Sequence, residues 1–152
     1  MIPKLPLSLL CAAALSFACG PRSRGDAPAV RDHAAAVPGA PLAPTLVVAV
    51  GDEVRFDFTV TNVGRSAAEV TFPDGRTHDV VVLDAEGREV WRWSTGRLFT
   101  QAMQAHVVRA GDALAYGAEW ERPAPGRYTA VATLASTDFP VTHRTEFVVP
   151  AM

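Results

Sequence analysis

Residues 54–61 read Val-Arg-Phe-Asp-Phe-Thr-Val-Thr and alternate apolar with polar side chains along their whole length. Successive side chains of an extended strand point to opposite faces, so Val54, Phe56, Phe58 and Val60 share one face. The opposite face carries an arginine, an aspartate and threonines. This pattern predicts a β-strand with one buried face and one exposed face.

Similar short runs fill the chain beyond Pro44, and turn sequences separate them. The separators at 73–75, Pro-Asp-Gly, and 84–87, Asp-Ala-Glu-Gly, contain residues that preset a turn or tolerate positive φ. No long stretch keeps a helical period, and residues 98–105 are expected to form a helical turn or an irregular crossover. Strands are expected at 45–50, 54–61, 68–72, 78–83, 88–94, 114–120, 128–134 and 143–149. The predicted class is all-β, an immunoglobulin-like antiparallel β-sandwich of about seven to eight strands.

Four aromatic residues are expected to form the aromatic part of the core. Period-two geometry puts Trp91 and Trp93 on one face of their strand, and Trp120 on the apolar face of a later one. Two indoles on one face make a large apolar anchor, so at least two of the three tryptophans should be buried. Tyr128, in the sequence Gly-Arg-Tyr at 126–128, also resembles a tyrosine corner, whose hydroxyl bonds back to the preceding backbone.

The N-terminal segment resembles a bacterial export signal. Lys4 precedes an apolar run at 7–18 that is too short to span a bilayer comfortably but has the length of a signal-peptide core. The sequence Leu-Ser-Phe-Ala-Cys-Gly at 15–20 resembles a lipobox, in which the cysteine receives a lipid. We therefore expect residues 1–19 to be a signal peptide, with lipidation of Cys19 anchoring the protein to the membrane at the cell envelope. The alternative is a plain secretory signal and a periplasmic or secreted protein.

The next segment separates this signal from the folded domain. Residues 20–44 are rich in Pro, Ala, Gly and Arg and hold too little bulky apolar surface to offset their ordering entropy, so a disordered tether is expected there. The β-sandwich domain should then span residues 45–150. Since Cys11 and Cys19 are the only cysteines, this domain has no disulfide, and packing must stabilise it.

Composition and motifs exclude several functions. A net charge of -2 provides no basic excess for nucleic acid. The histidines show no metal-ligand spacing, so no metal site is expected, and without any nucleotide-binding loop no cofactor is expected. Ser94 lies where a hydroxyl commonly caps a turn, and the carboxylates are expected at turns or on solvent faces, Asp79 among them. The chain is therefore predicted not to be an enzyme, although a site assembled from distant residues stays a third hypothesis.

Several segments together resemble a known family. The most specific are Val-Trp-Arg-Trp-Ser at 90–94 and Phe-Thr-Gln at 99–101, with Phe-Pro-Asp-Gly-Arg-Thr-His-Asp at 72–79 and Gly-Arg-Tyr-Thr at 126–129. From 54 to 134 the chain resembles the bacterial intracellular proteinase inhibitor family, known as the BsuPI domain. The resemblance implies an immunoglobulin-like sandwich that inhibits serine proteinases of the subtilisin type. It supplies no reactive-site residue, and the export signal departs from the intracellular setting in the family name.

Two functional hypotheses follow. In the first, the domain blocks a serine proteinase through a surface loop, at 74–77, 94–98 or 122–126. Arg76, Arg97 or Arg122 would offer a basic side chain to a trypsin-like pocket. In the second, the domain is a non-inhibitory module tethered to bind another envelope protein. The candidate contact residues are Asp74, Gly75, Arg76, Thr77, Ser94, Gly96, Arg97 and Arg122.

Overall fold

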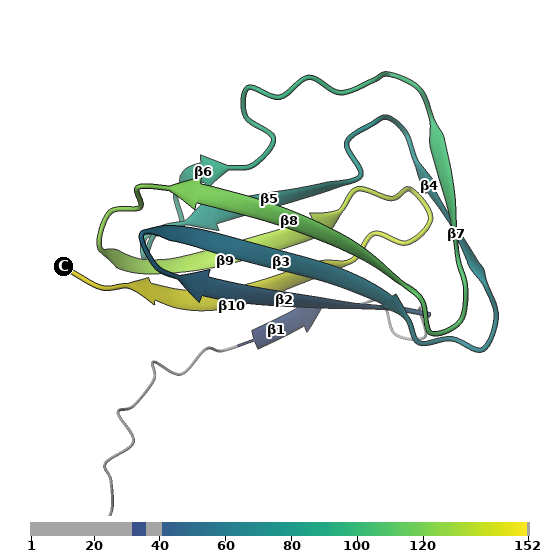
Figure 1. Ribbon diagram of the computed structural model, residues 1–152, viewed down its shortest axis with the longest axis horizontal. Helices are drawn as coiled ribbons and strands as arrows, with labels where there is room; N and C mark the ends of the chain where they lie inside the picture. The colour runs from purple at the N-terminus through teal and green to yellow at the C-terminus, as the bar shows by residue number, and fades with distance from the viewer. Residues whose placement is uncertain (1–31, 36–40, 152) are drawn as a thin grey trace, which may run out of the picture.

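The computed structural model describes residues 32–35 and 41–151, and these form antiparallel β-strands joined by turns and loops (Figure 1). The described residues contain no helix, and so none long and apolar enough to cross a membrane. The all-β prediction is confirmed. The strands are β1 (Asp32–Ala35), β2 (Leu42–Val50), β3 (Glu53–Asn62), β4 (Ala68–Phe72), β5 (His78–Leu83), β6 (Glu89–Arg92), β7 (Gln104–Val108), β8 (Ala113–Glu121), β9 (Gly126–Leu134) and β10 (Thr142–Val149).

Two main sheets enclose the core. One has five strands in the order β1-β10-β9-β5-β6, and the other has three in the order β2-β3-β8. Strands β4 and β7 pair separately as a two-stranded ribbon, which extends to one end of the molecule (Figure 1). Apolar side chains from both main sheets, such as Phe58 on β3 and Val82 on β5, belong to one buried cluster. This arrangement is a β-sandwich.

The alternation of apolar and polar residues predicted for residues 54–61 is present in β3, the central strand of its sheet. In β3, Val54, Phe56, Phe58 and Val60 are all at most 1% exposed, while on the other face Arg55 and Asp57 are exposed and the threonines are partly buried. Strand β3 pairs with β2 on one side and β8 on the other, so its position in the middle of the sheet is fixed by hydrogen bonds along both edges. The half-buried strand predicted from residues 54–61 is confirmed.

Some boundaries differ from the expectation. Residues 104–108 form β7 rather than continuing a helical turn or crossover, because β4 supplies a pairing partner that the local sequence does not reveal. Strand β2 begins at Leu42, whose buried side chain belongs to the core, and β1 pairs with β10. Both features fall within 20–44, the segment expected to be a tether. In its described parts, that segment contributes strands to both main sheets.

The four aromatic residues expected in the core lie at its edge. Trp91, Trp93, Trp120 and Tyr128 are partly buried and pack against the core cluster, so the expectation that at least two tryptophans are buried is corrected. The physical reason is topological: β6 and β8 are the last strands of their sheets and do not pair, and the rings of Trp91 and Trp120, 6.3 Å apart, stack across this opening. The tyrosine corner is confirmed, since the Tyr128 hydroxyl donates to the carbonyl of Ala124 at 2.9 Å.

Candidate functional site

Two loops that are separated in the sequence meet at one edge of the sandwich. The first connects β4 to β5 and the second connects β6 to β7. The backbone N–H of Gly75 donates to the carbonyl of Thr100 at 2.8 Å, which joins the loops directly. The contact is so close that a Cβ at Gly75 would lie 2.5 Å from Thr100 Oγ1. We call residues 74–77 and 94–101 together the loop pair.

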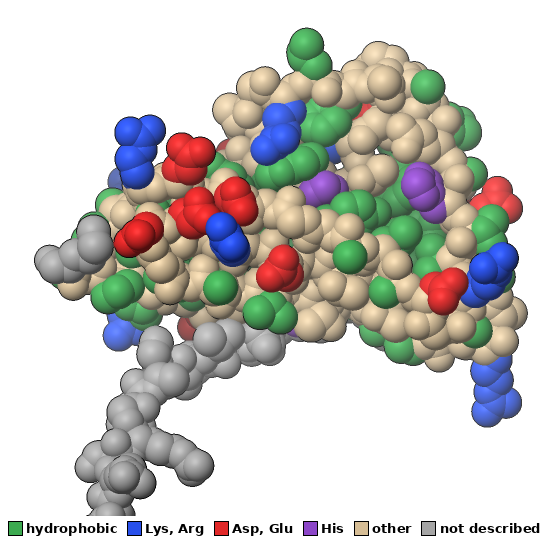
Figure 2. Space-filling model, viewed as in Figure 1, with side chains coloured by type: hydrophobic (Ala, Val, Ile, Leu, Met, Phe, Trp, Pro, Cys, Tyr) green, Lys and Arg blue, Asp and Glu red, His purple; other side chains and the backbone are tan. Residues whose placement is uncertain are grey.

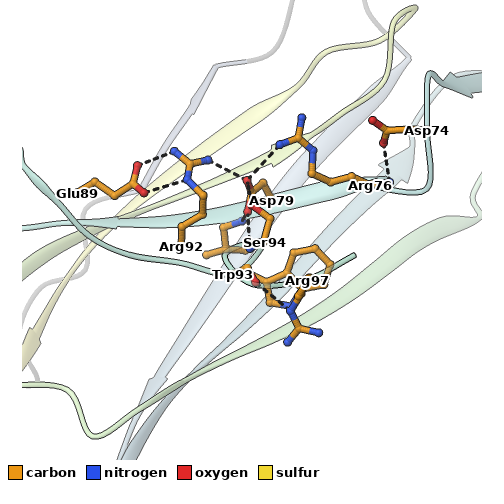
Figure 3. A network of polar contacts seen from close by, with 9 residues as sticks. Asp74, Arg76, Asp79, Glu89, Arg92, Trp93, Ser94 and Arg97 are labelled. Carbon is orange, nitrogen blue, oxygen red and sulfur yellow. Dashed lines mark hydrogen bonds and ion pairs between the residues drawn. The ribbon is translucent and has the colours of Figure 1, made fainter. Parts of the chain in front are cut away.

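A buried carboxylate ties both loops to the sheet (Figure 3). Asp79, on β5, accepts hydrogen bonds from Arg92 Nη1 at 2.8 Å, from Ser94 Oγ at 2.7 Å and from the backbone N–H of Ser94 at 3.2 Å. Arg76, from the first loop, approaches the same carboxylate at 3.9 Å. Asp79 therefore corrects the expectation that it lies on a solvent face: it is 8% exposed, because side chains from β6 and both loops cover it.

Arg92, which pairs with Asp79, also pairs with a second carboxylate, that of Glu89. Arg92 donates from Nε to Glu89 at 2.9 Å, so its guanidinium bridges two carboxylates (Figure 3). Hydrogen bonds to Glu89 and then to Asp79 raise the pKa of Arg92 above its usual range, because both carboxylates favour the charged form. A charge-assisted network of this kind holds its members in a narrow range of geometry.

A stack of three rings, from His78, Trp93 and Tyr116, supports the second loop. The ring of His78 lies between Trp93 and Tyr116, with ring centroids 4.1 Å and 4.2 Å away. Burial lowers the pKa of His78 to about 4, so the ring is uncharged at pH 7 and packs between the two aromatic rings. Its Nε2 is buried without a hydrogen-bond partner, while Nδ1 lies 3.4 Å from Thr77 Oγ1 in the first loop.

The tip of the second loop is held on both sides of Leu98. Arg97 donates from Nε to the carbonyl of Trp93 at 2.9 Å, and its guanidinium lies 4.5 Å over the Trp93 ring (Figure 3). Gly96 adopts a φ of 74°, which lets the backbone turn at this point. The Phe99 ring packs 5.7 Å from Trp93. Leu98, between these anchored residues, is 100% exposed.

The surface formed here is shallow. An open depression of about 380 Å³ is lined by Asp74, Arg76, Ser94, Arg97, Leu98, Phe99 and Gln101. Figure 2 shows hydrophobic and histidine side chains gathered below the loops that form the upper part of this face. A shallow, open surface with mixed polar and apolar lining suits contact with another protein better than enclosure of a small ligand. Within the described residues, His, Cys, Asp and Glu side chains form no group of three that would hold a metal ion.

The structure brings together most of the candidate residues named from the sequence. Asp74, Gly75, Arg76, Thr77, Ser94, Gly96 and Arg97 all belong to the loop pair. Arg122 does not: it lies in the exposed turn between β8 and β9, where it adopts a φ of 49°, and it does not line the depression. Cys19 lies outside the described residues.

Sequence reasoning missed three contributors to this surface. Asp79 and His78 open a strand that continues with three valines, and polar residues in an apolar run are a signal for buried partners. The third, Thr100, acts through its backbone carbonyl, for which the sequence carries no signal.

Comparison with known proteins gives a family and distant structural similarities. No curated protein sequence matches the chain. The crystal structure of a Bordetella pertussis protein, provisionally assigned as ApaA, aligns with a TM-score of 0.38 and 18% identity over 72% of this chain and 94% of that one. The X-ray structure of the structural-genomics target SoR45 aligns with a TM-score of 0.35 and 13% identity over 81% and 86%. Residues 45–149 match the family described as "BsuPI: Intracellular proteinase inhibitor".

Proposed function

The chain belongs to the BsuPI family of intracellular proteinase inhibitors, and from that premise we propose that it inhibits a serine proteinase by presenting the loop pair to the active-site cleft. The family name supports inhibition rather than catalysis. The observation that carries the choice of surface is the hydrogen bond between Gly75 and Thr100, because it turns two loops into one exposed and internally connected unit.

Rigidity is the property that an inhibitory loop needs. A nanomolar complex requires a binding free energy of about -12 kcal/mol. An interface of standard size buries about 800 Å² on each partner, and ordering of mobile side chains there subtracts about 0.5–1.5 kcal/mol for each one. Asp79 hydrogen-bonds to Ser94, and Trp93 packs against Arg97 and Phe99. These contacts already restrict the loop pair before binding. This pre-organisation supports a protein inhibitor at this edge of the sandwich.

We place the inhibitor at the cell envelope as part of the same proposal. The support is the sequence of residues 1–19, in which an apolar run precedes Cys19. Replacement of Cys19 by Ala should remove the mass of a lipid from the purified chain and leave residues 1–18 attached to it. A wild-type protein found in the soluble fraction without added mass would contradict membrane anchoring.

The inhibition itself is tested with the purified protein and a panel of subtilisin-like and trypsin-like proteinases. Progress curves should show saturable inhibition, while the intact mass of the protein stays unchanged. Arg97→Ala, which removes the stacking on Trp93, should weaken inhibition, and Arg122→Ala, an exposed arginine outside the loop pair, is the matched control and should leave it unchanged. The absence of inhibition across the panel would refute the proposal and favour the tethered interaction module.

A further inference from the structure

We infer that Leu98 is the side chain that enters the primary specificity pocket of the target, and that this pocket is therefore apolar. The inference rests on the proposed inhibitory function and adds the residue that enters the pocket and the polarity of that pocket. It also replaces the arginines at 76, 97 and 122, which the sequence suggested for a trypsin-like pocket.

Leu98 differs from the other apolar residues at the surface. Of the large apolar side chains in the described residues, it is the one that is 100% exposed, and the next is Met103 at 74%. A single exposed apolar residue is ordinary by itself. Here the residue occupies the tip of a loop that folding has already fixed, so burying it in a partner gains the full transfer of a leucine side chain from water. That gain corresponds to about a 10- to 100-fold increase in affinity.

The backbone on both sides of Leu98 is anchored. Before it, the N–H of Arg97 donates to the carbonyl of Ser94 at 3.1 Å, in a turn that the Asp79 network holds against β5. After it, the Phe99 ring packs near Trp93, and Thr100 accepts the hydrogen bond from the first loop. The exposed side chain therefore projects from a segment whose neighbours are held by contacts with Trp93 and with the first loop. A projecting side chain on a fixed segment is the arrangement that a proteinase pocket accepts at low entropic cost.

The arginines are less suited to fill such a pocket. Arg76 lies beside the Asp79 carboxylate, and Arg97 lies over the Trp93 ring, so entry of either into a pocket would break an existing contact. Arg122 belongs to a different turn.

Arg97 forms no ion pair with a carboxylate in the part of the chain that the structure describes. Its positive charge next to Leu98 favours a target whose apolar pocket has an acidic rim.

The test compares variants of the purified protein against a subtilisin-like proteinase with an apolar pocket and against trypsin. Leu98→Ala should raise the inhibition constant for the subtilisin-like enzyme by about 10- to 100-fold. Leu98→Lys should weaken that inhibition further and create inhibition of trypsin. Val63→Ala, an exposed apolar residue in the turn between β3 and β4, is the control and should change either constant by less than about twofold. Because Leu98 is fully exposed, its replacement leaves the core intact.

The outcomes separate this inference from the proposed function. If the wild-type protein inhibits the subtilisin-like enzyme and Leu98→Ala inhibits it equally well, the role of Leu98 is refuted while inhibition stands. The same conclusion holds if Leu98→Lys keeps the original preference. If the wild-type protein inhibits neither these two enzymes nor any other proteinase of the panel, the proposed function fails and the inference fails with it.

Discussion

Replacement of Asp79 by Asn tests whether the buried carboxylate fixes the loop pair. The substitution keeps the size of the side chain but removes its charge and turns one acceptor oxygen into a donor. In the folded protein that side chain accepts hydrogen bonds from Arg92 and from both the hydroxyl and the backbone N–H of Ser94. An amide at this position cannot accept from all of these donors, so at least one loses its partner.

The magnitude follows from the exposure of the partners. Loss of a hydrogen bond to a charged group costs about 1.5–3 kcal/mol, and breaking a fully buried ion pair costs about 3–5 kcal/mol. The Asp79 side chain is 11% exposed, but that of Arg92 is 35% exposed and keeps its contact with Glu89, so solvent screens part of the loss. We therefore expect the free energy of unfolding to fall by about 2–3 kcal/mol.

Urea unfolding followed by tryptophan fluorescence measures this effect. With an m-value of about 1–3 kcal/mol/M, a loss of about 2–3 kcal/mol should lower the midpoint by about 0.7–3 M. Asp57→Asn, on the exposed face of β3, is the matched control and should change stability by less than about 0.5 kcal/mol. A double-mutant cycle with Ser94→Ala should show coupling of at least about 0.5 kcal/mol. If Asp79→Asn is as stable as the control and the cycle shows no coupling, the network does not anchor the loops.

Two further predictions concern the loop pair and the ring that supports it, and a third concerns the tyrosine corner. The pKa of His78, lowered from 6.5 to about 4 by burial, means that the unfolded chain binds the proton more readily, so stability should fall by about 3 kcal/mol as pH drops from 6.5 to 4. His78→Phe should reduce the dependence of the urea midpoint on pH over that range. A dependence as steep as that of the wild-type protein would contradict burial of His78 as its cause. Gly75→Ala should force the loops apart at Thr100 and weaken inhibition. The control is Gly117→Ala, whose Cβ would meet nothing within 4 Å and which should leave inhibition unchanged. Equal inhibition constants for the two variants would show that the contact between Gly75 and Thr100 is not needed for inhibition. Tyr128→Phe should cost about 1 kcal/mol in urea unfolding through loss of its backbone hydrogen bond, and a wild-type midpoint would show that this bond adds nothing.

Much of the fold could be predicted from the sequence because burial leaves a period of two in each strand. In β10, Thr145, Phe147 and Val149 are buried and alternate with less buried residues, as the period of two requires. Strand β7 shows no such pattern: four of its five residues are wholly or partly exposed, and it exists because β4 hydrogen-bonds to it. Pairing between distant segments leaves no mark on the local sequence, so this strand was out of reach.

The candidate site was predictable in its parts but not in its assembly. Turn residues identified both loops, since aspartate and glycine at 74 and 75 and glycine at 96 have specific conformational uses. Nothing in the sequence indicated that Gly75 would approach Thr100, because that approach depends on the spacing of β5 and β6 in the folded sheet. The role of Asp79 was missed for a related reason: strand periodicity assigns a face, but it cannot show that neighbouring side chains will cover that face.

The structure separates the residues that fix the loop pair from the residue that would contact the target. Asp79 and His78 are buried, and each depends on several neighbours, so a substitution at either affects stability as well as shape. Leu98 has no buried surface, so a substitution there leaves the fold unchanged. Because both cysteines of the chain lie before residue 20, outside the domain, this buried network rather than a disulfide anchors the loop pair. Selection can therefore alter the specificity of the tip without loosening the loop that carries it, which is the property expected of one inhibitor scaffold that serves different proteinases.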